Sequence, residues 1–196
     1  MSDRPGTEIP DEVLCQRIAE RDDTAFDLLV ARWQGRAYRL AWSILRDVED
    51  ARDLSQEALV RLYETAASFQ GRARFSTWFY RILVNLCLDH RRRRSGWRRL
   101  LVIDTGGDDE PDTPLVERQP GETRDPADDL VREQMMARLW EAVHRLSPQQ
   151  RTAVLLQVQE DLSTAEIAEV LKCSEATVRV HLHRAVTALR ARVARD

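Results

Sequence analysis

The sequence predicts an all-α protein made of two small helical domains and a flexible acidic linker between them. Apolar residues recur at three- and four-residue spacing through most of the 196-residue chain, which is the period of a helix with one buried face. No segment alternates apolar and polar residues as a half-buried strand does. Within residues 96–125 the helical spacing stops, and glycine, proline and acidic residues predominate. Such a composition buries too little apolar surface to fold alone, so we expect domains at residues 1–95 and 126–196.

The first domain is expected to hold four helices. We expect them to start near Asp11 and to cover about residues 23–45, 47–68 and 76–94. In the second of these helices, Leu29, Trp33 and Leu40 show the spacing of a buried face. Gly71 separates the third helix from the fourth, because glycine favours a turn over a continuing helix.

The second domain is also expected to hold four helices, and capping residues mark where they start. Ser147 and Gln150 have the spacing of a capping box, in which two side chains bond to the first backbone amides of a helix. Residues 163–166 (STAE) form a second such pattern. Ser174 is suited to cap a last helix that ends near Val193.

Charge is distributed unevenly along the chain, although its sum is only −3. Residues 91–100 carry six basic side chains and no acidic one, whereas residues 101–130 carry ten acidic and two basic ones. The near-zero sum first suggests that the chain does not bind nucleic acid. The separation of the charges instead indicates one segment that contacts a polyanion and another that lies in a basic environment.

Composition also excludes several classes of protein. No apolar run reaches the roughly 18 residues that a membrane span needs, and the N-terminal residues lack the apolar core of a signal peptide. Cys15, Cys87 and Cys173 form no CxxC pair, so we expect a cytoplasmic location without a disulfide framework or a metal site. The histidines accompany no cluster of carboxylates, and the chain has no phosphate-binding glycine loop. We therefore expect no enzymatic activity, no catalytic residue and no cofactor.

The most specific pattern is a helix-turn-helix at residues 163–190. Its apolar spacing indicates a short helix, a tight turn and a second helix whose N-terminal turns would enter the major groove of DNA. The candidate DNA contacts on the second helix are Ser174, Glu175, Thr177, Arg179, His181, His183 and Arg184. A helical hairpin with a solvated basic face is the alternative. Cys173, His181 and His183 suit capping and packing better than metal binding, because no fourth ligand is suitably spaced.

A second pattern combines aromatic, amide and basic residues on the helix expected at 76–94. Trp78, Arg81 and Asn85 share one face, which continues toward Arg91 and Arg92 at the end of the helix. These residue types suit the stacking of unpaired bases and contact with their phosphates. Alternatively, Trp78 packs in the core and the arginines form a solvated helix end that the helix dipole favours. We favour core packing for Trp78 and polyanion contact for the arginines.

A third pattern is an acidic stripe on the helix expected at 47–68. Asp50, Asp53 and Glu57 recur at helical spacing, and Gln56 lies beside them. Most stripes of this kind are simply solvated. This one can also serve as a docking surface for a basic helix of a partner protein.

Together these patterns resemble the extracytoplasmic-function (ECF) sigma factors, a group within the sigma-70 family of bacterial RNA polymerase sigma factors. The matching residues are those at 50–57 (DARDLSQE), 69–82 (FQGRARFSTWFYRI), 85, 88–89, 146–148 (LSP), 163–171 and 177–179 (TVR). The matches occur in both halves of the chain, in the order of sigma regions 2 and 4. This arrangement is far more specific than a helix-turn-helix alone.

The resemblance implies a role for each pattern. Core RNA polymerase, through its β and β′ subunits, would be bound by Asp50, Asp53, Gln56 and Glu57. The −10 promoter element would be recognised and melted by Phe69, Trp78, Arg81, Asn85, Arg91 and Arg92. A base flipped out of the duplex would be held near Phe69 and Asn85, because a preformed pocket can open and read the duplex together. The helix beginning at Ser174 would read the −35 element.

The resemblance also implies how the rest of the chain works. The acidic linker would lie in basic channels of the polymerase, and an anti-sigma factor would cover both domains. Val180, His181 and Val186 depart from residues common in the family, which leaves the individual −35 contacts open. The alternative is an autonomous helix-turn-helix regulator that binds palindromic operators without polymerase.

Overall fold

The computed structural model describes residues 9–100 and 126–193. Over these residues it contains eight α-helices, one short 3-10 helix and no β-strand, so the prediction of an all-α protein is confirmed. Residues 101–125, most of the expected acidic linker, lie outside the described part of the chain.

The N-terminal half holds the four expected helices. They are α1 (Asp11–Ala19), α2 (Asp23–Leu45), α3 (Val48–Thr65), followed by the short η1 (Ala66–Ser68), and α4 (Phe75–Leu100). The last helix continues past the end expected near Arg94 and includes Gly96. A glycine costs a helix only about 1 kcal/mol relative to alanine, so it does not end a helix whose other residues favour the conformation.

Local side-chain bonds explain where the helices of this half begin and end. The Asp22 carboxylate accepts a hydrogen bond from the amide of Ala25 at 3.0 Å, and Asp47 does the same for Asp50 at 3.0 Å. These amide bonds lower the pKa of both carboxyl groups. At the other end of α2, Arg46 adopts a left-handed conformation with φ 61°, which stops the helix.

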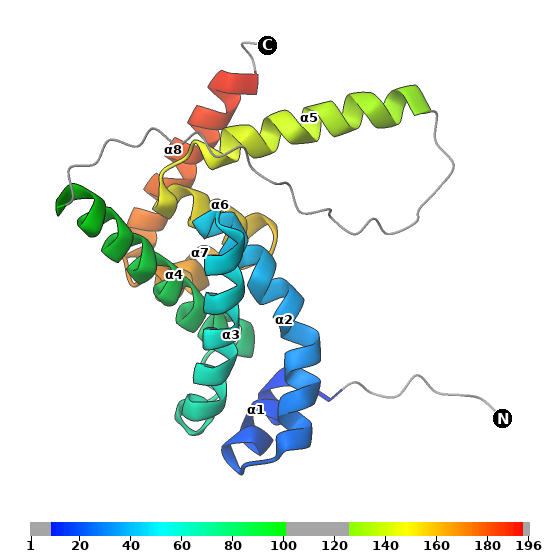
Figure 1. Ribbon diagram of the computed structural model, residues 1–196, viewed down its shortest axis with the longest axis vertical. Helices are drawn as coiled ribbons and strands as arrows, with labels where there is room; N and C mark the ends of the chain where they lie inside the picture. The colour runs from blue at the N-terminus through cyan, green and yellow to red at the C-terminus, as the bar shows by residue number, and fades with distance from the viewer. Residues whose placement is uncertain (1–8, 101–125, 194–196) are drawn as a thin grey trace.

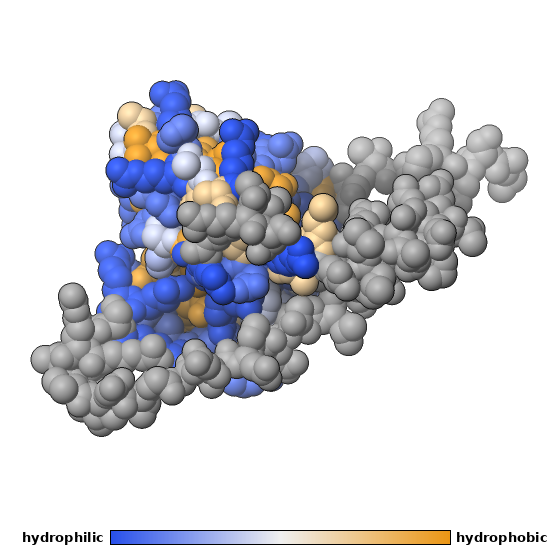
Figure 2. All heavy atoms as spheres, turned by 90° about the horizontal axis from the view of Figure 1, so that it is seen from above, coloured by the Kyte–Doolittle hydropathy of each residue, from blue (hydrophilic) through white to orange (hydrophobic). Residues whose placement is uncertain are grey.

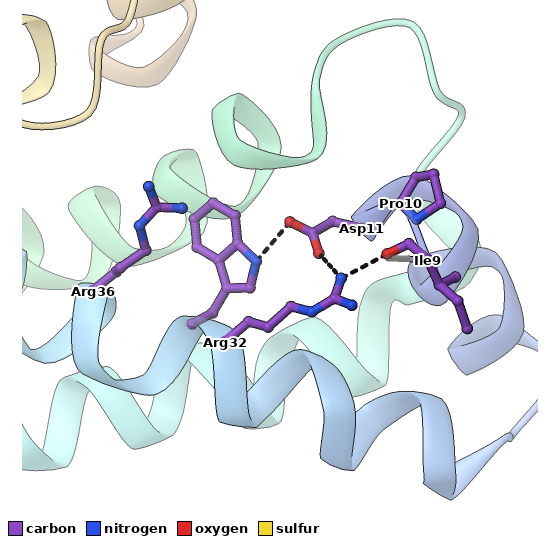
Figure 3. A pocket seen from close by; sticks show the side chains of 6 residues that line it. Ile9, Pro10, Asp11, Arg32 and Arg36 are labelled. Carbon is purple, nitrogen blue, oxygen red and sulfur yellow. Dashed lines mark hydrogen bonds and ion pairs between the residues drawn. The ribbon is translucent and has the colours of Figure 1, made fainter. Parts of the chain in front are cut away.

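Aromatic packing between α2 and α4 forms the centre of the N-terminal core. The indole of Trp33 lies edge-on to the rings of Phe75, Phe79 and Tyr80, with ring centroids 5.2 to 5.5 Å apart. The Trp33 indole N–H also donates to Asp11 at 2.9 Å, which fastens α1 to α2. Figure 3 shows this junction, where Arg36 lies at one end of a surface pocket of about 420 Å³, Ile9 and Pro10 lie at the other, and Asp11 lies between them.

The C-terminal half also holds the expected four helices. They are α5 (Pro126–His144), α6 (Pro148–Val158), α7 (Thr164–Leu171) and α8 (Glu175–Val193). Both predicted capping boxes are present, with Ser147 and Gln150 at the start of α6 and Ser163 and Glu166 at the start of α7. Lys172, with φ 53°, turns the chain from α7 toward α8.

The two halves pack against each other. Helix α7 contacts α4, and α6 contacts α2 (Figure 1). Buried side chains of both halves, such as Leu83 and Ile167, belong to one continuous hydrophobic core. The described surface seen from above is mainly hydrophilic, with smaller hydrophobic areas between the polar side chains (Figure 2). The two halves thus lie in direct contact in this structure.

Candidate nucleic-acid interface

Helices α7 and α8 form the predicted helix-turn-helix. Ile167 on α7 and Val178 and Ala185 on α8 are buried, which holds the two helices together. Ser174 caps α8 by accepting a hydrogen bond from the amide of Thr177 at 3.1 Å. The cap fixes the direction in which the first turns of α8 leave the turn. Those turns carry the candidate −35 contacts.

Most of these candidates face solvent. Ser174, Glu175, Thr177, Arg179, His183 and Arg184 are exposed. Arg179 bonds to Glu175 one turn earlier at 2.7 Å, but its side chain remains 66% exposed. An exposed ion pair of this kind is weak, so DNA can replace it. The exception is His181, which is half-buried and whose Nδ1 has no hydrogen-bond partner within the described residues.

The candidate −10 residues on α4 differ in their exposure to solvent and in their hydrogen bonds. Arg81 and Arg92 are exposed, and Asn85 is half-buried with its amide bonded to the carbonyl of Arg81. Arg91 instead donates to the carbonyl oxygen of Ile44 at the end of α2, at 2.7 Å. Burial lowers the pKa of Arg91. By this hydrogen bond the Arg91 guanidinium caps the C-terminal end of α2. The run of arginines in the sequence did not reveal this role.

Trp78 and Phe69 lie side by side at the start of α4. Trp78 is only 7% exposed, and its ring lies 5.3 Å from that of Phe69 and 6.0 Å from that of Phe75. Core packing thus describes the position of Trp78, as we favoured from the sequence. Phe69 is half-buried and lies in the loop between η1 and α4, so part of its ring reaches solvent.

The acidic stripe lies on α3 and is only partly available. Asp53 and Gln56 are exposed, and Glu57 bonds to Arg61 at 2.6 Å. Asp50 is held by the end of α4, where Arg94 lies 2.7 Å and His90 3.0 Å from its carboxylate. Residues 44 positions apart carry no local signal of such a pair, so the sequence did not reveal it.

No three His, Cys, Asp or Glu side chains gather as a metal site would require in the part of the chain that the structure describes. Among the described helices, none combines the length and the apolar character that crossing a bilayer demands.

A helix-turn-helix with an exposed first turn, joined to a helical domain with an arginine-bearing face, defines a class of helical DNA-binding protein. Residues 29–96 match the family Sigma-70 region 2, and residues 136–189 match Sigma-70 region 4. The chain belongs to the sigma-70 family and, within it, to the ECF sigma factors.

Curated relatives agree with this assignment over almost the whole chain. The RNA polymerase sigma-H factor of Pseudomonas aeruginosa is 32% identical over 187 residues, which cover 93% of each chain. The ECF RNA polymerase sigma-E factor of Haemophilus influenzae is 30% identical, over 91% of this chain and 92% of the relative.

Two solved structures share the fold. CnrH in complex with the cytosolic domain of CnrY has a TM-score of 0.65 and 22% identity, covering 95% of this chain and 98% of that one. The sigma factor RpoE of Bartonella quintana, in complex with the anti-sigma factor NepR, has a TM-score of 0.66 and 20% identity. That match covers 87% of this chain and 98% of RpoE.

Proposed function

We propose that this chain is a promoter-specificity subunit of RNA polymerase, without catalytic activity of its own, that works in the cytoplasm. One observation carries the proposal. The exposed first turns of α8 and the exposed arginines of α4 occur in one chain that matches sigma regions 2 and 4 in order. In this proposal α8 reads the −35 element and α4 contacts the −10 element.

Helix α8 reads bases by its first two turns. Arg179 can donate two hydrogen bonds to a guanine edge or bind a phosphate, and Thr177 and Glu175 can meet base edges beside it. Arg184 lies one to two turns further along, where the helix leaves the groove, so we assign it to phosphate contact. His181 faces partly inward and contributes through packing.

The N-terminal half contacts the melted −10 element. Arg81 and Arg92 bind phosphates of the single strand, while the exposed part of Phe69 and the amide of Asn85 receive an extruded base. Trp78 supports this surface from beneath, since its ring packs on Phe69. Base extrusion costs a few kcal/mol, which a preformed aromatic surface offsets.

Docking to core polymerase is assigned to the exposed part of the α3 stripe. Asp53 and Gln56 are exposed, and the Glu57 side chain is 43% exposed, so all three can face a basic helix. Because the stripe is negative, it favours a positive partner surface and repels nucleic acid. Asp50 joins this surface only after releasing Arg94.

An anti-sigma factor is the expected regulator. The solved structures of CnrH and RpoE are complexes, and the partner of RpoE is the anti-sigma factor NepR. By similarity, we propose that a protein of this class binds the present chain. The regulated promoters would then become active when a signal releases it.

Binding assays with and without polymerase test this function against its main alternative. A sigma factor should co-purify with core polymerase and give a promoter footprint only when core is present. An autonomous regulator should footprint a palindromic operator by itself and ignore core polymerase. A footprint by the chain alone, unchanged by core, would reject the proposal.

A further inference from the structure

Helix α8 has a buried side and an exposed side, and the middle of its exposed side is apolar. The helix packs on α5, α6 and α7, and its Val178 and Ala185 are fully buried. Ala176 and Val180 each lie two residues from Val178, so at about 100° per residue they are about 160° around the helix from it. Both side chains are exposed, that of Val180 to 46%. These two residues form the central line of the face that α8 turns to solvent.

Basic residues flank this central line on both sides. Arg179 lies about 100° from Val178 in one direction, and Arg184 lies about 120° from it in the other. Both arginines are exposed, and the side chain of Arg179 is 66% exposed although it pairs with Glu175. A face with an apolar centre and basic edges matches the major groove of DNA, where base edges lie between two rows of phosphates. An apolar protein surface matches it less well, because the guanidinium groups would lose water without gaining phosphates.

Neither packing nor helix formation accounts for a valine at position 180. Its side chain is about half exposed, and valine forms helices less readily than alanine, leucine or arginine. A single exposed valine is common on protein surfaces, and Val186 on the same helix is 42% exposed. Val180 differs from Val186 in its place, because it lies on the central line, near the start of the helix and next to Arg179.

The central line can select a base only through apolar contact. The side chains of Ala176 and Val180 carry no hydrogen-bonding group. The hydroxyl of the neighbouring Thr177 is engaged in the cap of α8, where it lies 2.9 Å from the hydroxyl of Ser174. The apolar group that bases present in the major groove is the C5 methyl of thymine. Thymine is therefore the base that this part of α8 is suited to distinguish.

We propose that Val180, together with Ala176, contacts the C5 methyl group of a thymine in the −35 element and thereby selects an A·T pair at that position. This inference rests on the proposed function, because it names the chemistry by which α8 reads the element assigned to it above. Ala176 lets the helix lie close to the base edges, since its side chain is a single methyl group. Val180 supplies the larger apolar contact, and Arg179 binds the guanine or phosphate beside it.

Replacing thymine by uracil tests this contact, because uracil lacks only the C5 methyl and pairs with adenine in the same way. Promoters are mapped by sequencing the RNAs that start when this protein is overproduced, and their −35 elements should share a thymine at one fixed position. Each thymine of one such element is replaced in turn by deoxyuridine, and the affinity of the complex of core polymerase with this protein is measured. One replacement should weaken binding about fourfold, the factor that burial of one methyl group gives.

Variants of two exposed valines show whether Val180 makes the contact. Val180→Ala should remove most of the difference between the thymine and uracil promoters. Val186→Ala, the same change at a similarly exposed position of the same helix, should retain the fourfold difference. Alanine favours a helix more than valine does, so both variants should fold, which circular dichroism checks. Equal sensitivity to the methyl group in Val180→Ala and the unmodified protein, or no sensitivity at any thymine, would overturn the proposal.

A promoter with a fully scrambled −35 element separates this inference from the function on which it rests. If scrambling weakens binding while Val180→Ala leaves the methyl sensitivity unchanged, the thymine contact alone is overturned. If scrambling leaves the affinity of the polymerase complex unchanged, α8 does not read a −35 element. That result would reject the proposed role of the helix together with the contact.

Discussion

Arg94, near the end of α4, lies 2.7 Å from the carboxylate of Asp50 on α3. It thereby joins the basic end of the helix assigned to DNA with the acidic stripe assigned to polymerase. The Asp50 side chain is 24% exposed in this pair, whereas Asp53 one turn later is exposed. Docking is therefore expected to depend first on Asp53 and Glu57.

Replacing both Asp53 and Glu57 by lysine should abolish association with core polymerase. The change reverses the charge of the docking surface while leaving the buried face of α3, including Leu54 and Ala58, intact. The midpoint of thermal unfolding should stay close to that of the unmodified protein, and core binding is read by gel filtration. The matched control is Glu20→Lys with Asp27→Lys, two exposed positions away from the stripe. Equal core binding by the two double variants would contradict the docking assignment.

Arg179→Ala should weaken binding to the −35 element by about 1–3 kcal/mol, as expected for loss of a base contact. The measurement is the affinity of the polymerase complex for promoters with an intact or scrambled −35 element. Arg190→Ala, three turns later on the same helix and also exposed, should have a much smaller effect. A loss of the same size on both promoters would mean that Arg179 contacts only phosphate.

Substitutions of Trp78 and Arg81 should have different effects, one on the stability of the protein and the other on DNA binding. Because Trp78 is 7% exposed, Trp78→Ala should lower the free energy of unfolding by about 3–5 kcal/mol. Arg81 is exposed, so Arg81→Ala should leave urea unfolding nearly unchanged and weaken binding to a single-stranded −10 oligonucleotide. Normal stability of the Trp78 variant would contradict its placement in the core.

His144 should make the protein less stable in mild acid. Burial, followed by the nearby charges of Arg46 and Arg151, lowers its pKa to about 4. The unfolded chain binds a proton as the pH falls through about 6.5, whereas the folded chain resists it until about pH 4. Stability present above pH 6.5 is therefore lost progressively between these values.

Urea unfolding at about pH 7.5 and about pH 5 measures this loss. His144→Gln should lose less stability over the interval than the unmodified protein. The exposed His183→Gln variant serves as the control and should retain the full dependence. Identical losses in all three proteins would rule out His144 as the source.

The sequence predicted the helices and their starting residues well, because these depend on local features. Spacing identified the buried face of α2, and the capping boxes at Ser147 and Ser163 appear as expected. Core packing of Trp78 was favoured from the sequence, and its ring does lie beside those of Phe69 and Phe75. Helix α4 continues beyond the end expected near Arg94, because one glycine, Gly96, costs a helix too little to stop it.

Long-range pairs could not be predicted in this way. Tyr80 and Glu160, or Arg94 and Asp50, are far apart in the sequence and meet only after the helices have packed. The role of Arg91 as a cap on α2 was hidden for the same reason, since its neighbours are also arginines. Which charges are available to a partner is thus decided by tertiary structure.

Run-off transcription with purified core polymerase tests the central claim most directly. The template carries a promoter mapped by sequencing the RNAs that start when this protein is overproduced. A transcript from the mapped start is expected only when core and this protein are both present, and it should be lost with the Asp53→Lys, Glu57→Lys variant. A transcript that core makes equally well without the protein, or no transcript from any mapped start, would contradict the account.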